Sequence, residues 1–351
     1  FFHYYLPTPY LVFTYYNKNL QLGLIQMYDI IMELKSKLYQ MFILGIDPKN
    51  TPQAILNDLG GVIFFTKDIK STDGFKFLIQ DLDKKAKIKP FFSIDQEGGR
   101  VERTENIHNG KKYLSAKYAY EKGLDFLEKQ TEEISKELKE YGINLNFAPC
   151  TDVNSNPNNP IINERAFADN PEDVIKGARV VIKTYRENGI IPCIKHFPGH
   201  GDTSKDSHLE LPTLNQTLEE LEQIHIKPFK TLIKDGIEMV MVAHIQANAF
   251  GKEYPTSLNK NCIDYLKNTL GFDGVIISDD MYMKAIADNY GFEKACELGI
   301  RAGLNMFIYR DASDEVINMI ENIYQKALKD TELREKIEYS FEKIQKLKEK
   351  I

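Results

Sequence analysis

The chain has 351 residues, of which 42% are hydrophobic and 27% charged, so it can bury a full hydrophobic core. Its formal net charge of -6 argues against nucleic acid or an anionic membrane as the main partner. It contains no run of about 18 or more apolar residues, so no segment is expected to span a membrane.

Organised sequence begins near Met27. We therefore expect residues 1–26 to form a poorly ordered N-terminal extension and residues 27–351 to form one domain. The aromatic-rich segment Phe1–Asn19 has neither a basic n-region nor a small-residue cleavage site, so it does not resemble a signal peptide. No linker or strong internal repeat divides the rest of the chain.

Eight short apolar runs recur along the domain. They are Met41–Ile46, Gly61–Phe65, Pro90–Ile94, Ile143–Ala148, Ile190–Ile194, Met239–Ala243, Gly274–Ile277 and Asn305–Tyr309. Continuous apolar runs are typical of parallel strands that are buried on both faces. Because helical segments separate these runs, the sequence predicts an α/β protein with a (β/α)8 TIM barrel rather than a doubly wound sheet.

Proline and glycine mark several helix boundaries. Thr51-Pro52 and Asn170-Pro171 each indicate an N-cap followed by proline at the first helical position. The charged stretch from Ser115 to Tyr141 predicts one long helix, which Gly142 ends. The Lys/Glu-rich stretch Asp330–Ile351 predicts a final helix packed on the barrel.

The four cysteines form no C-x-x-C pair: Cys150, Cys193, Cys262 and Cys296. This spacing argues against a disulfide scaffold or a zinc ribbon. We expect reduced thiols in a cytoplasmic enzyme.

Polar residues follow the apolar runs, at the end where TIM-barrel enzymes carry their active sites. They include Asp95, Asp152, Asn154, Lys195, His196, His244, Asp279, Asp280, Arg310 and Asp311. The densest group is the segment Lys195–His208, which holds three His, two Asp and two Lys among its fourteen residues. A polar surface loop is the simpler interpretation, but function concentrates on such barrel loops.

Two kinds of chemistry compete for this segment. His196, His200, Asp202, Asp206 and His208 are possible metal ligands. Ligation by His196 and His200 at a spacing of four needs a helix, which Pro198-Gly199 interrupts, so we expect no metal and no cofactor. The alternative is acid–base work on a glycosidic bond, which needs a carboxylate and a proton donor.

Asp279 is the candidate carboxylate because it directly follows a buried run. It could instead cap a helix that starts near Met281, although Asp280 could fill that role. A second carboxylate beside Asp279 would raise its pKa, so a nucleophile here needs compensating donors such as Lys195 or Arg165.

Three motifs now lie in order along the chain: SIDQEGGRVERT (93–104), KHFPGHGDTSKDSHLELP (195–212) and GFDGVIISDDM (271–281). With them, the sequence resembles glycoside hydrolase family 3, and most closely its β-N-acetylglucosaminidases that act on peptidoglycan fragments. The likeness covers about Tyr39 to Arg310. Several motifs in family order are far more specific than one.

The resemblance implies a retaining, two-step mechanism through a covalent glycosyl-enzyme. Asp279 would be the nucleophile, and His208 paired with Asp206 would be the acid/base. A carboxylate beside an imidazole raises its pKa and lets it donate a proton near neutral pH. The sugar-binding positions carried over by motif are Asp95, Arg103, Arg165, Lys195 and His196; part of this set could instead satisfy buried charges, and Arg100 is expected to be structural.

Two positions depart from the family pattern. Tyr282 stands where a smaller residue is expected, and Ala166 where a hydroxyl side chain is common. No second domain follows the barrel, which we take to favour the single-domain hexosaminidase branch. The expected protein is a bacterial monomer that acts on muropeptides or other GlcNAc-containing carbohydrates. A β-N-acetylglucosaminide phosphorylase, with phosphate as acceptor, and a catalytically silent sugar-binding barrel are the alternatives.

Overall fold

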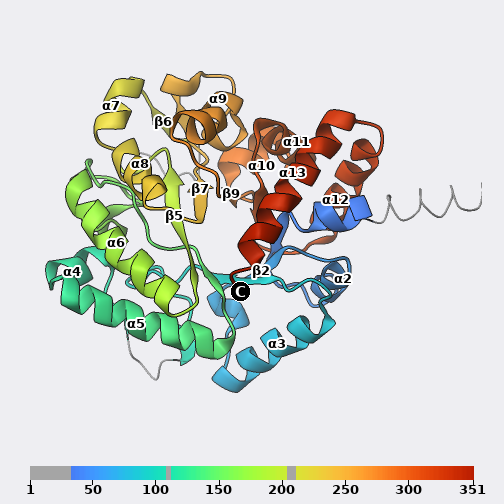
Figure 1. Cartoon of the computed structure of the whole chain (residues 1–351), viewed down its shortest axis with the longest axis horizontal. Helices are drawn as coiled ribbons and strands as arrows, with labels where there is room; N and C mark the ends of the chain where they lie inside the picture. The colour runs from blue at the N-terminus through green and yellow to red at the C-terminus, as the bar shows by residue number, and fades with distance from the viewer. Residues whose placement is uncertain (1–32, 108–111, 204–210) are drawn as a thin grey trace, which may run out of the picture.

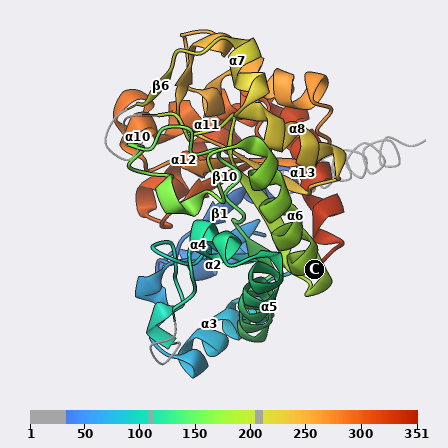
Figure 2. The ribbon, with the colours of Figure 1, turned by 90° about the vertical axis from the view of Figure 1, so that its left-hand side faces the viewer.

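The computed structural model describes residues 33–107, 112–203 and 211–351. Parallel strands close into a barrel in the order β1-β10-β9-β7-β5-β4-β3-β2, and helices surround it (Figures 1 and 2). The strands are β1 (Phe42–Leu44), β2 (Gly61–Phe64), β3 (Phe91–Ile94), β4 (Leu145–Asn146), β5 (Ile191–Phe197), β7 (Met239–Val242), β9 (Val275–Asp280) and β10 (Met306–Tyr309). The predicted (β/α)8 barrel is confirmed, with every expected strand present.

The helices follow the strands along the chain. They are α2 (Thr51–Leu56), α3 (Thr72–Lys85), α4 (Ala116–Glu121), α5 (Leu124–Tyr141), α6 (Pro171–Glu187), α7 (Leu218–Gln223), α8 (Ile226–Lys234), α9 (Lys260–Asp264), α10 (Lys284–Tyr290), α11 (Phe292–Ala302), α12 (Asp314–Ala327) and α13 (Thr331–Lys348). A small parallel sheet of β6 (Thr213–Leu214) and β8 (Gln246–Ala247), which was not predicted, lies outside the barrel. No helix in the described ranges has the length and apolar character that crossing a membrane requires.

The barrel strands are buried along nearly their whole length. All residues of β2, β3, β5, β7 and β10 are buried. Side chains that point inward fill the barrel, and those that point outward pack under the helices. This explains why the strands appear in the sequence as continuous apolar runs.

Two strands extend beyond their predicted ends. β5 continues to Phe197, which pairs with Val242, although the register shifts between Ile194 and Phe197. Lys195 and His196 are therefore on the strand and not in the loop after it. β9 likewise continues through Asp280, so its last two residues are both carboxylates.

Helix boundaries agree with the sequence in most places. Asn170 caps α6 by accepting a hydrogen bond from the Asp173 amide, as predicted. The single helix predicted over residues 115–141 is wrong, because Gly123, with φ 102°, separates α4 from α5. The N-cap of α2 is Asn50 rather than Thr51. The predicted C-terminal helix is α13, and the extension at residues 1–26 lies outside the described residues.

Candidate active site

Lys195 lies at the centre of the charged groups at the barrel mouth. Its ammonium group is 2.7 Å from Oδ1 of Asp95 and 2.6 Å from Oε1 of Glu97. Only 2% of its side chain is exposed. Burial disfavours the charged form, but Asp95 and Glu97 outweigh it and raise the pKa of Lys195. The strand end therefore carries a permanently charged donor.

Arg165 holds the other side of Glu97. Its Nε and Nη2 atoms each donate to the carboxylate at 2.9 Å, which is a bidentate pair. Burial of Glu97 favours protonation, yet Arg165 and Lys195 together hold its pKa well below the ordinary range. Because both cations and the carboxylate are buried, removing any one member leaves an uncompensated charge.

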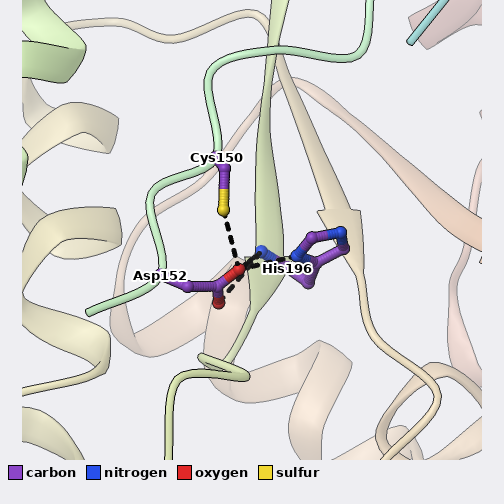
Figure 3. A group of neighbouring side chains, drawn as sticks. All are labelled: Cys150, Asp152 and His196. Carbon is purple, nitrogen blue, oxygen red and sulfur yellow. Dashed lines mark hydrogen bonds and ion pairs between the residues drawn. The ribbon is translucent and has the colours of Figure 1, made fainter. Parts of the chain in front are cut away.

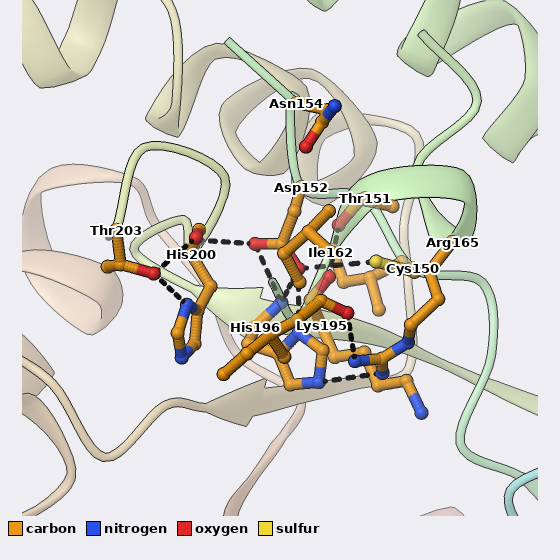
Figure 4. Close-up of polar contacts among 12 residues, drawn as sticks. Cys150, Thr151, Asp152, Asn154, Ile162, Arg165, Lys195, His196, His200 and Thr203 are labelled. Atoms are coloured by element: carbon orange, nitrogen blue, oxygen red, sulfur yellow. Dashed lines mark hydrogen bonds and ion pairs between the residues drawn. The ribbon is translucent and has the colours of Figure 1, made fainter. Parts of the chain in front are cut away.

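A second buried carboxylate, Asp152, organises the end of β5 (Figures 3 and 4). It accepts hydrogen bonds from the backbone amides of His196 and His200 and from the Cys150 thiol. The Nδ1 atom of His196 lies 2.6 Å from Oδ2 of Asp152. On the other side of the ring, Nε2 of His196 lies 3.3 Å from Nη2 of Arg165. Asp152 accepts a hydrogen bond from Nδ1, and Arg165 donates one to Nε2. These two partners select the neutral tautomer of His196 that is protonated on Nδ1.

His200 is also held by its surroundings. Its Nδ1 atom lies 2.6 Å from Oγ1 of Thr203, and the side chain is almost completely buried. Burial lowers the pKa of His200 to about 4. The ring is therefore neutral at pH 7 and is poorly suited to act as a general acid.

Cys150, Asp152 and His196 are close enough together to resemble a three-ligand metal site. Their donor chemistry argues against that interpretation. Burial and the Asp152 charge raise the pKa of Cys150, so its thiol stays protonated and donates to Asp152. The adjacent Arg165 guanidinium would repel a cation. We interpret the group as a hydrogen-bonded network that fixes the His196 ring.

Asp279 and Asp280 form the end of β9. Asp279 is partly buried, and its Oδ1 accepts the backbone N–H of Asp280 at 2.7 Å. In the strand order, β9 lies directly across the barrel from β3, which leads into Asp95. Asp280 does not cap a helix as considered above, because α10 begins only at Lys284 with Met283 as its N-cap.

The two arginines of the β3 loop lie in different surroundings. Arg100 donates to the carbonyl oxygens of Pro160 and Ile161, which agrees with its expected structural role. The Arg103 guanidinium lies 5.8 Å from the Phe65 ring, and within the described structure its Nε has no hydrogen-bond partner. It is not part of the Glu97 network.

Of the predicted site residues, Asp95, Arg165, Lys195 and His196 form one connected network. Arg103 lies further along the loop that follows β3, and Asp279 lies at the end of β9 on the same barrel face. Asp206 and His208 lie outside the described residues.

Two members of the network were not assigned a role from the sequence: Glu97 and Asp152. Charge balance could have pointed to them in the sequence, because buried Lys195 and Arg165 require carboxylate partners. Glu97 lies two residues after Asp95 in the first motif, and Asp152 follows the fourth apolar run.

Residues 33–347 match the glycosyl hydrolase family 3 N terminal domain. The chain belongs to this family. Beta-hexosaminidase A of Pseudoalteromonas piscicida is 35% identical over 271 residues, which are 71% of this chain and 45% of that protein. The beta-hexosaminidase of Methylococcus capsulatus is 31% identical over 267 residues, which are 75% of this chain and 78% of that one.

Solved structures of family 3 enzymes have the same fold. The family 3 β-N-acetylglucosaminidase of Paenibacillus sp. FPU-7 superposes with a TM-score of 0.83 and 29% identity, covering 90% of this chain and 62% of that one. This chain therefore spans less than two thirds of the length of the Pseudoalteromonas and Paenibacillus proteins. The resemblance inferred from the three sequence motifs is confirmed at the level of the family.

Proposed function

We propose that the protein is a retaining β-N-acetylglucosaminidase that removes terminal GlcNAc from peptidoglycan fragments of the GlcNAc-1,6-anhydroMurNAc peptide type. The observation that carries this is the position of Asp279 at the end of β9, across the barrel from the β3 end that leads into Asp95, whose carboxylate pairs with Lys195. A sugar ring between them meets a carboxylate on one side and charged hydrogen-bonding groups on the other. Relatives named beta-hexosaminidase support the choice of sugar.

The proposed first step transfers the sugar to the enzyme. Asp279 attacks the anomeric carbon, and His208 protonates the departing glycosidic oxygen. In the second step neutral His208 takes a proton from water, which displaces Asp279 and restores the free enzyme. Asp206 stabilises the imidazolium between the steps.

The structure supports the choice of His208 among the three histidines of the segment. His196 is held as a neutral tautomer by its hydrogen bonds to Asp152 and Arg165. His200 is buried and neutral at pH 7. His208 is then the histidine of the segment left for proton transfer. The four cysteines are free and buried, which supports a cytoplasmic location for the bacterial enzyme, and we propose that it acts as a monomer.

The test is to replace Asp279 by Ala and measure hydrolysis of 4-nitrophenyl N-acetylglucosaminide. Turnover should be lost, while Asp288→Asn, which changes an exposed carboxylate on α10, should leave it unchanged. Wild-type enzyme treated with a fluorinated, slowly released sugar should gain its mass on the Asp279 peptide. Substantial turnover by the Asp279→Ala variant would overturn the proposal. GlcNAc 1-phosphate formed in phosphate buffer would identify a phosphorylase instead.

A further inference from the structure

Asp280, the neighbour of the proposed nucleophile, is held in an unusual environment. Its carboxylate is largely buried, with 21% of the side chain exposed. Oδ1 accepts the backbone N–H groups of Tyr282 at 3.1 Å and Arg310 at 3.3 Å. Oδ2 lies 3.0 Å from Nε of Arg310. Asp280 therefore joins the end of β9 to the end of β10.

Arg310 is itself held in place. Its guanidinium lies 5.3 Å from the centre of the Tyr282 ring, within cation–π range. That ring packs edge-on against Phe292, and its hydroxyl contacts Asp311 and Ser313. The Tyr282 ring thus supports the arginine that pairs with Asp280.

The charges around Asp280 come from three directions. Asp279 precedes it on β9, and its negative charge opposes ionisation of Asp280. Arg310 on the β10 side favours ionisation, and the buried hydroxyl of Tyr309 lies near enough to be affected by Asp280. Burial outweighs Arg310 and raises the pKa of Asp280 to about 6. Without the guanidinium, burial and the Asp279 charge would raise the pKa of Asp280 further.

We propose that Arg310 is a positioning residue for the glycosidase reaction, acting through Asp280 to keep that carboxylate ionised and the end of β9 that carries Asp279 in place. This inference rests on the proposed role of Asp279 as nucleophile. The ionised form of Asp280 is the one that accepts from Arg310 and from both backbone amides. Protonation of Asp280 would weaken these hydrogen bonds, loosen the end of β9 and disturb the attacking carboxylate.

The test is the dependence of kcat/KM on pH for Arg310→Gln, measured with 4-nitrophenyl N-acetylglucosaminide. The acidic limb should move to higher pH by about one unit, with a largely preserved plateau above it. Arg310→Lys should restore most of the wild-type limb. Arg301→Gln, which removes a guanidinium paired with Glu297 and Asp330, should leave the limb unchanged.

A double-mutant cycle with Asp280→Asn tests whether Arg310 acts through Asp280. In the Asp280→Asn background, Arg310→Gln should no longer move the limb. A limb that does not move in the single variant, or that moves equally in both backgrounds, overturns the inference. Failure of the proposed function has a different signature, because Asp279→Ala would then retain turnover.

Discussion

Lys195 and Glu97 form an ion pair of 2.6 Å at the barrel mouth, with 2% and 4% of their side chains exposed. Arg165 approaches the same carboxylate oxygen at 2.9 Å. The two buried cations therefore share one buried carboxylate, and Asp95 is a second partner of Lys195. Such a buried group stabilises the fold only while all its charged members are present, because water cannot solvate a charge that loses its partner.

Replacing Glu97 by Gln should be severe for both stability and activity. The side chain keeps its shape but leaves Lys195 and Arg165 without their shared charge, so the free energy of unfolding should fall by about 3 kcal/mol or more. We expect kcat/KM to fall by at least about 100-fold, because both cations shift. Urea denaturation and steady-state kinetics measure the two effects.

A matched surface change sets the scale for Glu97. Glu128→Gln breaks a 3.0 Å pair with Lys183, in which 49% and 59% of the side chains are exposed. Its effect should stay within about 0.5 kcal/mol. Equal effects of the Glu97 and Glu128 substitutions would show that the buried network has no special role.

Replacing His208 by Ala should depend strongly on the leaving group. Poor leaving groups need protonation, so kcat/KM for a disaccharide substrate should fall by about 100-fold or more. An activated aryl glycoside departs as a stable anion and should lose far less in its first step. Comparing initial rates for the two substrates checks this, and equal losses would count against an acid/base role.

Removal of metal ions should leave the activity unchanged. The Cys150 thiol is protonated, and Asp152 and His196 already hydrogen-bond to each other. Activity before and after dialysis against a chelator measures the effect. Loss of activity that zinc restores would revive the metal interpretation of this group.

Lys348 on α13 provides a test of pH-dependent stability. Its Nζ has no hydrogen-bond partner within the described structure and lies 5.0 Å from the Phe91 ring centre. Burial lowers the pKa of Lys348 to about 7. Between about pH 7 and 10.5 the unfolded chain therefore carries a proton on Lys348 that the folded chain lacks. The resulting destabilisation is full below pH 7 and disappears as the pH rises through that window.

Lys348→Met should therefore raise the free energy of unfolding near pH 7 by about 2–4 kcal/mol, and by much less near pH 10. Denaturant unfolding at both pH values measures the difference. The exposed Lys346 on the same helix is the matched control, and Lys346→Met should show little change at either pH. A gain for Lys348→Met that is independent of pH would contradict the predicted neutral state of the buried amine.

The sequence by itself determined the barrel and the location of its chemistry. Continuous apolar runs separated by helices admit few other folds, and polar residues such as Asp95 and Asp279 follow directly from the ends of those runs. The motifs were sufficient for the family, because several matching segments in order are specific even when each one alone is not.

Only the tertiary structure decided which charges meet. Glu97 and Arg165 are 68 residues apart, and Asp152 and His196 are 44 apart, so no local pattern predicts either pair. The extension of β5 through His196 was also not predicted, because a charged strand end resembles a loop in sequence. Pairing with the neighbouring strand β7 and burial beside Asp152 stabilise it as a strand. Long-range charge compensation depends on barrel closure, which brings distant strand ends to one face.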